Sequence, residues 1–263
     1  CDGEEICINK IVPLLNSKLD LNLELVWNEC GNQLDNSNCI CQFAPAPRYE
    51  CEVGVASSSL ENNISGDNYA VFKQNQGEFM VVLSDGMGVG AKAAQESRTA
   101  ISLLEKMLKA GLDYELALHT VNSTLGIRST EDIFATIDLL NIDQKTGRAE
   151  FVKVGSASSF IKRGSDISMV KSSSLPIGIL NEIEIEPNSL QLKDNDLIIM
   201  MSDGVLDGKK NLTIKEEWIL KVLKNNLINE PQSLAHYILD KAQAENNKFD
   251  DDMTVLVIKV DKC

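Results

Sequence analysis

The residues most able to do chemistry are two aspartates, each in a Ser-Asp-Gly motif at the end of an apolar run. One run, Phe79–Leu83, leads into Ser84-Asp85-Gly86, and the other, Leu197–Met201, leads into Ser202-Asp203-Gly204. A buried strand holds a carboxylate at its end rigidly, and the glycine that follows lets the backbone approach an ion or a phosphate closely. One such motif is compatible with an ordinary turn after a strand, but its repetition at two distant places favours a functional site.

Two further aspartates stand beside strand-like segments. Asp67 belongs to Ser65-Gly66-Asp67, and Asp251 belongs to the acidic triplet Asp250–Asp252, which precedes the apolar run Met253–Ile258. No histidine or cysteine lies near these aspartates in the sequence, and oxygen ligands alone are typical of hard divalent cations. The sequence therefore predicts a metal site built from carboxylates at strand ends.

Metal-assisted hydrolysis is the chemistry that such a site supports. Two divalent ions roughly 3.5–4 Å apart can bridge a water molecule, lower its pKa and hold a phosphoryl oxygen, with no covalent intermediate. We expect Asp85 to bridge the two ions and Gly86 to offer its carbonyl oxygen. We expect Asp203 and Asp251 to hold the second ion, and Asp67 to complete the shell of the first, directly or through water. The four aspartates are therefore the candidate catalytic residues.

Three other enzyme classes fit the motifs less well. Gly86–Ala91 matches a dinucleotide-binding glycine pattern, but the acid required about twenty residues later falls at Glu105, inside an expected helix. A haloacid-dehalogenase-type phosphatase needs a second aspartate two residues after the first, where this chain has Met87. A serine or cysteine hydrolase needs a histidine base, and His119 and His236 both fall in helical patterns typical of surface or core-edge residues.

The cysteines leave two interpretations open. Six of the seven lie within the first 51 residues, and no Cys-x-x-Cys pair occurs, so neither a disulfide scaffold nor a zinc ribbon is predicted. Cys30, Cys39, Cys41 and Cys51 form a candidate set of metal ligands. We favour the alternative, in which they are reduced and partly buried thiols.

Charge and composition restrict the class of protein. The chain of 263 residues has 39 acidic and 25 basic residues and a net charge of -14, which argues against nucleic-acid binding. No apolar run approaches the roughly 18 residues of a membrane span, so we expect a soluble cytoplasmic domain. Because the chain begins at Cys1 rather than Met and has no signal peptide, we expect it to be a fragment of a longer protein with a membrane anchor upstream.

The composition and the pattern of apolar residues change near residue 48. Residues 1–47 are irregular, and 31–47 are rich in Asn, Cys and Pro, so we interpret them as the end of an upstream regulatory region and a cysteine-rich linker. Residues 48–263 are expected to form one domain of short strands joined by turns, with one helical pair after the first Ser-Asp-Gly motif and another near the C-terminus. Successive strands without intervening helices predict an α+β domain with antiparallel sheets. The expected strands include Ile183–Ile185, and the expected helices include Ile214–Leu227.

Taken together, the motifs resemble those of the metal-dependent PPM (type 2C-like) serine/threonine phosphatases, in their bacterial branch. The matching segments are Ser65-Gly66-Asp67, Ser84–Gly88, Ser202-Asp203-Gly204 and Asp251–Thr254, with Val154–Ala157, Phe160–Gly164 and Leu175–Gly178 in agreement. Each motif alone is weak evidence for the family, but the whole set is specific. The matching segments extend over about Tyr49–Val260.

The resemblance implies an α-β-β-α sandwich of two antiparallel sheets with two manganese ions at one edge, for which magnesium can substitute. It implies a phosphoserine substrate, the phosphorylated anti-sigma factor antagonist, whose dephosphorylation activates a sporulation sigma factor, and it is compatible with a homodimer. It leaves open whether Asp251 or Asp252 is the ligand, because Asn often stands at the second position in the eukaryotic branch. The alternative to an enzyme is a catalytically silent module that keeps the fold and binds a phosphoprotein.

Overall fold

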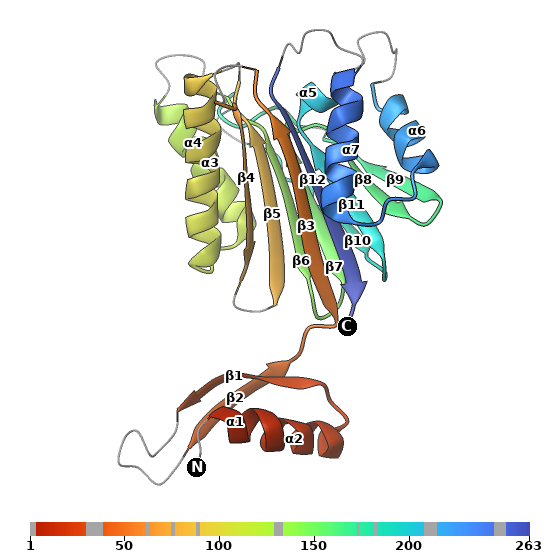
Figure 1. Ribbon diagram of the computed structural model, residues 1–263. Coiled ribbons are helices and arrows are strands. Elements are labelled where there is room, and N and C mark those ends of the chain that lie inside the picture. The colour runs from red at the N-terminus through yellow and green to blue at the C-terminus, as the bar shows by residue number, and fades with distance from the viewer. Residues whose placement is uncertain are drawn as a thin grey trace. The chain divides into compact units, whose positions relative to one another are not determined.

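The protein folds into two compact units, Cys1–Arg48 and Tyr49–Cys263 (Figure 1). The computed structural model describes residues 4–29, 39–60, 64–74, 77–87, 90–128, 134–172, 174–180, 183–207, 215–244 and 251–263. None of the helices within these residues is long and apolar enough to cross a lipid bilayer.

The first unit combines a helical segment with a two-stranded antiparallel sheet. Its elements are α1 (Glu4–Ile6), the π-helical η1 (Cys7–Ile11), α2 (Val12–Leu19), β1 (Leu23–Glu29) and β2 (Ile40–Pro45). Asn16 ties α2 to β1, because its Oδ1 accepts a hydrogen bond from Leu23 N–H at 2.8 Å and its Nδ2 donates to the Leu23 carbonyl at 3.1 Å. Part of the predicted linker is therefore a strand, since residues 40–45 pair with β1 despite their irregular composition.

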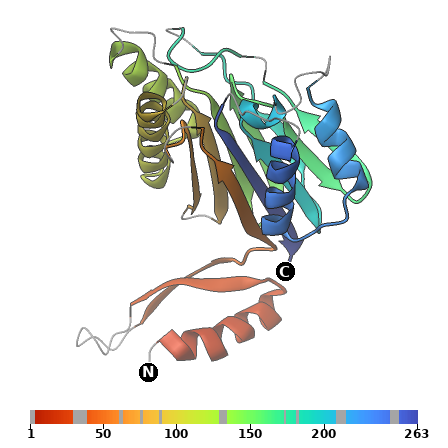
Figure 2. The same cartoon turned by 45° about the horizontal axis from the view of Figure 1, so that its top comes forward.

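The second unit consists of two five-stranded antiparallel sheets with helices on the outer faces (Figures 1 and 2). One sheet has the order β10-β7-β6-β5-β4 and the other has the order β3-β12-β11-β8-β9. The strands are β3 (Tyr49–Ser58), β4 (Asp67–Lys73), β5 (Glu78–Asp85), β6 (Ile137–Asp143), β7 (Arg148–Val154), β8 (Ser159–Arg163), β9 (Asp166–Val170), β10 (Asn188–Gln191), β11 (Asp196–Met201) and β12 (Met253–Lys262). The helices are α3 (Ala91–Lys109), α4 (Tyr114–Arg128), α5 (Asp203–Leu206), α6 (Glu217–Asn225) and α7 (Pro231–Ala244). The predicted α+β sandwich is confirmed.

Three apolar layers hold the sandwich together. In β5, Val81 and Leu83 face the layer between the two sheets, whereas Met80 and Val82 face the layer beneath α3 and α4. The third layer lies beneath α6 and α7 and contains the fully buried Trp218. A strand covered on both faces needs apolar residues at successive positions, which is why Phe79–Leu83 is a continuous apolar run. The strand that ends at Asp85 is consequently fixed from both sides.

Two expected elements differ from the structure. Ile183–Ile185 do not form a strand, because Ile183 is buried and Ile185 partly buried against the layer beneath α3 and α4, while sheet pairing begins only at β10. Alternating apolar residues can therefore reflect packing against a helical layer as well as strand pairing. Helix α6 starts later than expected, and Ile214 lies outside the described residues. The short helix α5 after the second Ser-Asp-Gly motif was not expected.

Helix α7 packs closely on β3 through Gly54. A Cβ atom placed on Gly54 would lie 2.2 Å from the backbone nitrogen of Gln232. The Gln232 side chain reinforces this contact, because it accepts a hydrogen bond from Val55 N–H at 3.0 Å and donates to the Val55 carbonyl at 2.6 Å. Any side chain at position 54 must therefore separate the helix from the sheet.

We expect Gly54→Ala to lower the free energy of unfolding by about 2 kcal/mol or more, because the added methyl group overpacks a backbone contact. Urea denaturation measures this change. The matched control is Gly126→Ala in α4, where an added Cβ would meet nothing within 4 Å. That substitution should raise the free energy of unfolding by up to about 1 kcal/mol through helix propensity. Equal effects of the two substitutions would contradict the proposed contact.

Candidate metal centre

The ladder between β4 and β5 brings Asp67 and Asp85 together. Their register pairs Asp67 directly with Asp85 at the end of both strands. Directly opposed Cβ atoms of an antiparallel pair lie roughly 4.5–5.5 Å apart, so the two carboxyl groups share one site. Asp67 is 7% exposed, and neither of its carboxylate oxygens accepts a hydrogen bond of good geometry from the residues that the structure describes, although the hydroxyl groups of Ser202 and Thr254 lie nearby. Two neighbouring acids of which one is buried are stable only if they are protonated or if a positive charge compensates them.

Asp203 reaches the same place from the other sheet. It begins α5, directly after β11, and its carboxyl group lies within hydrogen-bonding reach of that of Asp85. Asp85 and Asp203 also line one small cavity, together with Thr136 and Ser156. The two Ser-Asp-Gly motifs, which come from different sheets, therefore converge at one end of the sandwich.

The acidic triplet contributes two aspartates with different surroundings. Both oxygens of Asp252 are engaged, because Oδ1 accepts a hydrogen bond from Leu60 N–H at 2.7 Å and Oδ2 accepts one from Gly66 N–H at 2.6 Å. Asp251 accepts a hydrogen bond only from the next backbone amide among its described contacts, and it lies close enough to Asp203 to feel its charge. These contacts favour Asp251 as the ligand and give Asp252 the role of fixing the loop before Asp67.

The glycine of each motif allows a close backbone contact. A Cβ on Gly86 would lie 2.2 Å from the carbonyl oxygen of Ala93 in the first turn of α3. A Cβ on Gly204 would lie 2.1 Å from the carbonyl oxygen of Asp252. The packing of neighbouring chain segments therefore requires both glycines. The predicted role of the Gly86 carbonyl as a metal ligand stays a prediction.

The electrostatics of the site favour protonated carboxyl groups when no cation is present. Burial raises the pKa of Asp85 to about 10, and the charges of Asp67 and Asp203 add to this effect. Burial also raises the pKa of Asp67 to about 7, although the nearby hydroxyl groups of Ser202 and Thr254 oppose the shift. Burial likewise raises the pKa of Asp251. A bound cation would reverse these shifts, because it stabilises the ionised form.

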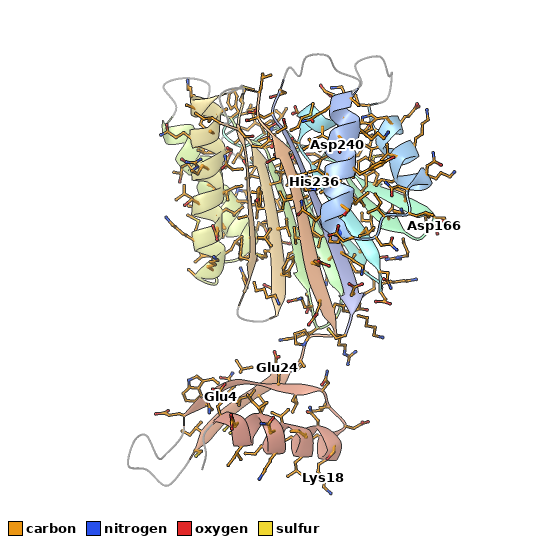
Figure 3. All side chains as sticks on the ribbon, viewed as in Figure 1. Glu4, Lys18, Glu24, Asp166, His236 and Asp240 are labelled. Atoms are coloured by element: carbon orange, nitrogen blue, oxygen red, sulfur yellow. The ribbon has the colours of Figure 1, made fainter. Side chains whose placement is uncertain are left out.

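The donor atoms suit a hard divalent cation, although the described side chains do not enclose one. Within the described residues, no three Asp, Glu, His or Cys side chains form a complete group of ligands. The unpartnered oxygens of Asp67 and the all-oxygen character of the site nevertheless fit Mg²⁺ or Mn²⁺. Figure 3 shows His236 on the outer helix α7.

The candidate metal site formed by cysteines receives no support from the described residues. Cys7 Sγ lies 3.5 Å from Cys41 Sγ in the first unit, whereas Cys51 belongs to β3 of the second unit. Cys30 lies outside the described residues. Among the cysteines that are described, all are free thiols.

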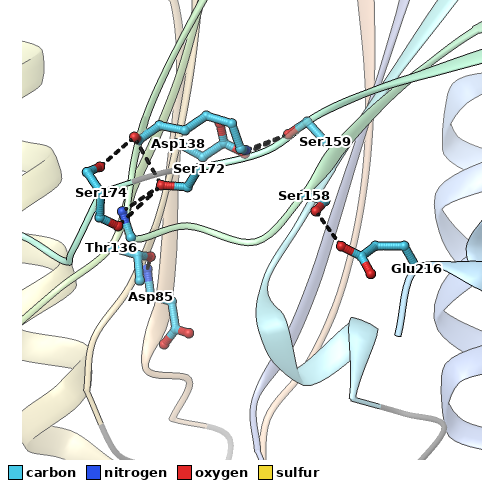
Figure 4. Close-up of polar contacts among 10 residues, drawn as sticks. Asp85, Thr136, Asp138, Ser158, Ser159, Ser172, Ser174 and Glu216 are labelled. Atoms are coloured by element: carbon cyan, nitrogen blue, oxygen red, sulfur yellow. Dashed lines mark hydrogen bonds and ion pairs between the residues drawn. The ribbon is translucent and has the colours of Figure 1, made fainter. Parts of the chain in front are cut away.

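Sequence reasoning missed a buried polar network beside Asp85 (Figure 4). Lys153 Nζ lies 2.5 Å from Asp138 Oδ2 and 2.9 Å from Ser159 Oγ, and the side chains of both charged residues are 1% exposed. Thr136, which lines the same small cavity as Asp138, holds the backbone of Asp85, because its Oγ1 accepts a hydrogen bond from Asp85 N–H at 3.0 Å and its own N–H donates to the Asp85 carbonyl at 2.8 Å. The sequence did contain a signal for this pair, because Asp138 and Lys153 each interrupt an apolar strand, β6 and β7. Charged residues that are buried are usually paired with one another.

The fold is that of the PP2C class of phosphatases. A solved structure of the PP2C phosphatase domain and a fragment of the regulatory domain of the cell fate determinant SpoIIE from Bacillus subtilis matches all of this chain and 76% of that chain. The two are 35% identical in sequence and superimpose with a TM-score of 0.81. This likeness confirms the phosphatase class that the aspartate motifs predicted.

The family model for stage II sporulation protein E (SpoIIE) matches residues 75–261. Stage II sporulation protein E of Bacillus subtilis (strain 168) is 38% identical over 253 residues, which are 95% of this chain and 30% of that protein. Phosphoserine phosphatase RsbP of the same organism is 22% identical over 207 residues, covering 76% of this chain and 50% of RsbP. The chain belongs to the stage II sporulation protein E family and spans about three-tenths of the length of the Bacillus subtilis member.

The different contacts of Asp251 and Asp252 predict different consequences of mutation. Asp252→Asn should lower the free energy of unfolding in chelator by about 2 kcal/mol, because buried backbone N–H groups lose a charged acceptor. Asp251→Asn should leave that free energy nearly unchanged and, if Asp251 is a ligand, weaken the binding of a divalent cation such as Mg²⁺ by about tenfold or more. Urea denaturation and isothermal titration calorimetry measure the two effects. The reverse pattern would exchange the roles of the two residues.

The raised pKa values of Asp67 and Asp85 predict that the metal-free protein loses stability as the pH rises. Between the ordinary value of 3.8 and the folded values of about 7 and about 10, the folded state binds more protons than the unfolded state. The free energy of unfolding should therefore fall across this window, with Asp67 alone contributing on the order of 4 kcal/mol. Urea denaturation in chelator, from about pH 5 to about pH 9, measures the slope.

Asp85→Asn should flatten this slope, because it removes one buried titrating group. We also expect an added divalent cation to stabilise the wild-type protein, and Asp85→Asn should reduce this effect because it removes a candidate ligand. Asp240→Asn makes the same charge change on the exposed face of α7 and should alter neither quantity (Figure 3). Wild-type stability that increased with pH across the window would be incompatible with the assigned pKa shifts.

Proposed function

We propose that the protein is a manganese-dependent protein phosphatase that hydrolyses phosphoserine. The observation that carries this proposal is the pairing of Asp67 with Asp85 in a buried site, where both oxygens of Asp67 lack described partners. Membership of the stage II sporulation protein E family supports the phosphatase activity. The name of the relative phosphoserine phosphatase RsbP supports the choice of phosphoserine.

In this proposal Asp67, Asp85, Asp203, Asp251 and the carbonyl of Gly86 hold two divalent ions, which are Mn²⁺ with Mg²⁺ as a substitute. When bound, such ions lower the pKa of a water molecule and neutralise charge on a phosphoryl oxygen. The proposed reaction needs no nucleophilic side chain.

The remaining contacts keep the ligands in position. The backbone of Asp85 is held on both sides by Thr136, through hydrogen bonds to its N–H and its carbonyl. Asp252 fixes the segments around Leu60 and Gly66, which precede Asp67. Ligands held in this way lose little conformational entropy when they bind a cation.

The proposed substrate is a phosphorylated anti-sigma factor antagonist, and its dephosphorylation activates a sporulation sigma factor. We also propose that the parent protein is anchored in the membrane, that this domain lies in the cytoplasm, and that it acts as a homodimer. Family membership supports these proposals. They concern the whole protein, because the chain covers 30% of the Bacillus subtilis relative.

Hydrolysis of p-nitrophenyl phosphate and of a phosphoserine-bearing antagonist, each with Mn²⁺ or with a chelator, tests the proposal. We expect Mn²⁺-dependent release of phosphate from both, with a larger kcat/KM for the protein substrate. Asp85→Asn should lower kcat/KM by about 100-fold or more, because it removes a carboxylate that would hold the ions. Asp240→Asn, with the same charge change on α7, should not.

Activity that survives both the chelator and Asp85→Asn would refute metal-assisted hydrolysis. Binding of the phosphorylated antagonist without any turnover in Mn²⁺ would instead identify a catalytically silent module. Activity on the aryl phosphate alone would refute the proposed protein substrate.

A further inference from the structure

The described part of the first unit buries very few side chains. Within residues 4–29 and 39–48, Cys7 is the one residue that is buried, with 1% of its surface exposed. Small units with few buried side chains usually depend on a crosslink, a metal or a partner for their stability. A bond between the helical segment and the two-stranded sheet would therefore change how firmly these elements are held together.

Cys7 meets a second thiol where the helical segment contacts the sheet. Its Sγ lies 3.5 Å from Sγ of Cys41, although the two residues are 34 positions apart in the sequence. Cys7 belongs to η1 and Cys41 belongs to β2, so the contact joins the two parts of the unit. Because a disulfide bond is about 2.05 Å long, the two sulfur atoms are in contact but not bonded.

The two thiols differ in their exposure to solvent. Cys7 is enclosed, whereas Cys41 is partly exposed. A bulky reagent in solution can therefore reach Cys41 but not Cys7, and the thiol of Cys7 can react only with its neighbour. An accessible thiol beside a second thiol that resolves the first adduct is the arrangement of redox-sensing cysteine pairs.

Two thiols are sufficient for a disulfide, whereas a structural zinc site takes four ligands. Within the described residues, no three Cys, His, Asp or Glu side chains form a group of metal ligands. Cys39, two positions before Cys41, is exposed. The chemistry that the described thiols support is therefore oxidation of one pair, and Cys39 offers a matched thiol outside that pair.

We propose that Cys7 and Cys41 form a reversible disulfide when a small-molecule disulfide such as oxidised glutathione reacts with them. The Cys41 thiolate attacks one sulfur of the oxidant, and a glutathione thiolate leaves. The Cys7 thiol then loses its proton, its thiolate attacks Sγ of Cys41, and a second glutathione thiolate leaves. The protein loses two protons and two electrons, and one molecule of oxidised glutathione becomes two molecules of the thiol.

The new bond ties η1 to β2 and restrains the helical segment against the sheet. Excess thiol reverses it, because the sulfur of Cys41 is within reach of solvent. The site is independent of the phosphatase chemistry, since both thiols lie in the first unit and all four candidate aspartates lie in the second.

Treatment of the whole chain with oxidised glutathione, followed by alkylation of the remaining free thiols, tests the proposal. Fragment-ion mass spectrometry of tryptic peptides should show Cys7 linked to Cys41 within one chain, and reduced glutathione should remove the link. Cys39→Ser is the matched control, because it removes an exposed thiol two positions away. It should change the extent of linkage by less than about twofold.

Two single variants test the order of the steps. In Cys7→Ala, Cys41 should carry at least about tenfold more glutathione adduct than in the wild-type protein, because the neighbouring thiol that displaces glutathione is gone. In Cys41→Ser, Cys7 should stay free of glutathione under the same conditions, because it is enclosed. Cys41 is partly exposed, so this second variant keeps the test decisive even where Cys7→Ala does not fold.

Hydrogen exchange measures what the bond does to the first unit. The backbone amides of α2 should exchange at least about threefold more slowly in the oxidised than in the reduced wild-type protein, because opening of the helical segment is then restrained by the crosslink. The same treatment of Cys41→Ser should leave the exchange rates unchanged. Equal rates in oxidised and reduced wild-type protein would show that the bond restrains nothing.

Three further results would overturn the proposal. One is recovery of Cys7 and Cys41 as free thiols under conditions that modify the exposed Cys39. Another is linkage of Cys41 to a cysteine other than Cys7, or to a second copy of the chain. The third is a glutathione adduct on Cys7 in Cys41→Ser that forms as readily as the adduct on Cys41 in Cys7→Ala, which would contradict the assigned order of attack.

Discussion

The mutual repulsion of Asp67 and Asp85, placed opposite one another at the end of a β-ladder, is the constraint on which the candidate metal centre depends. Backbone pairing along β4 and β5 sets their separation, so neither side chain can retreat without breaking the ladder. Burial then makes ionisation of either carboxyl group unfavourable. Because the sheet keeps the two side chains together, the repulsion is relieved either by protonation, as the raised pKa values indicate, or by a cation, which would let both groups ionise.

The sandwich brings the remaining acids to these two. Asp85 ends a strand of one sheet, and Asp203 follows a strand of the other, so the apolar layer between the sheets decides how they approach each other. Gly86 and Gly204 then let neighbouring backbone segments come closer than a Cβ atom would allow. Asp252 accepts hydrogen bonds from two backbone amides, one with each carboxylate oxygen. The centre is thus assembled from rigid strand ends and closely packed turns.

Strand β5 and helix α3 both extend between two different polar regions. Strand β5 has Asp85 at one end and Glu78 at the other, roughly 23 Å apart at the usual rise of a strand. Helix α3 begins beside Gly86 and ends at a second cavity, which is lined by the connection between α3 and α4 and by residues of β5, β6 and β7. The apolar side chains of β5 between these ends are buried on both faces of the sheet.

Much of this protein followed from the sequence alone. The repeated Ser-Asp-Gly motifs and the apolar runs before them predicted metal-assisted hydrolysis at strand ends, and the order of strands and helices predicted an α+β domain with antiparallel sheets, because both depend on local pattern. The phosphatase class and the sandwich arrangement were implied by the resemblance of the whole set of motifs to the PPM phosphatases. Tertiary structure decided the rest. It gave Asp252 its backbone partners, made residues 40–45 a strand, left Ile183–Ile185 without one, and joined Lys153 to Asp138 beside the site. These outcomes depend on which distant segments pack together, and a residue's own neighbours in the sequence carry no record of that packing.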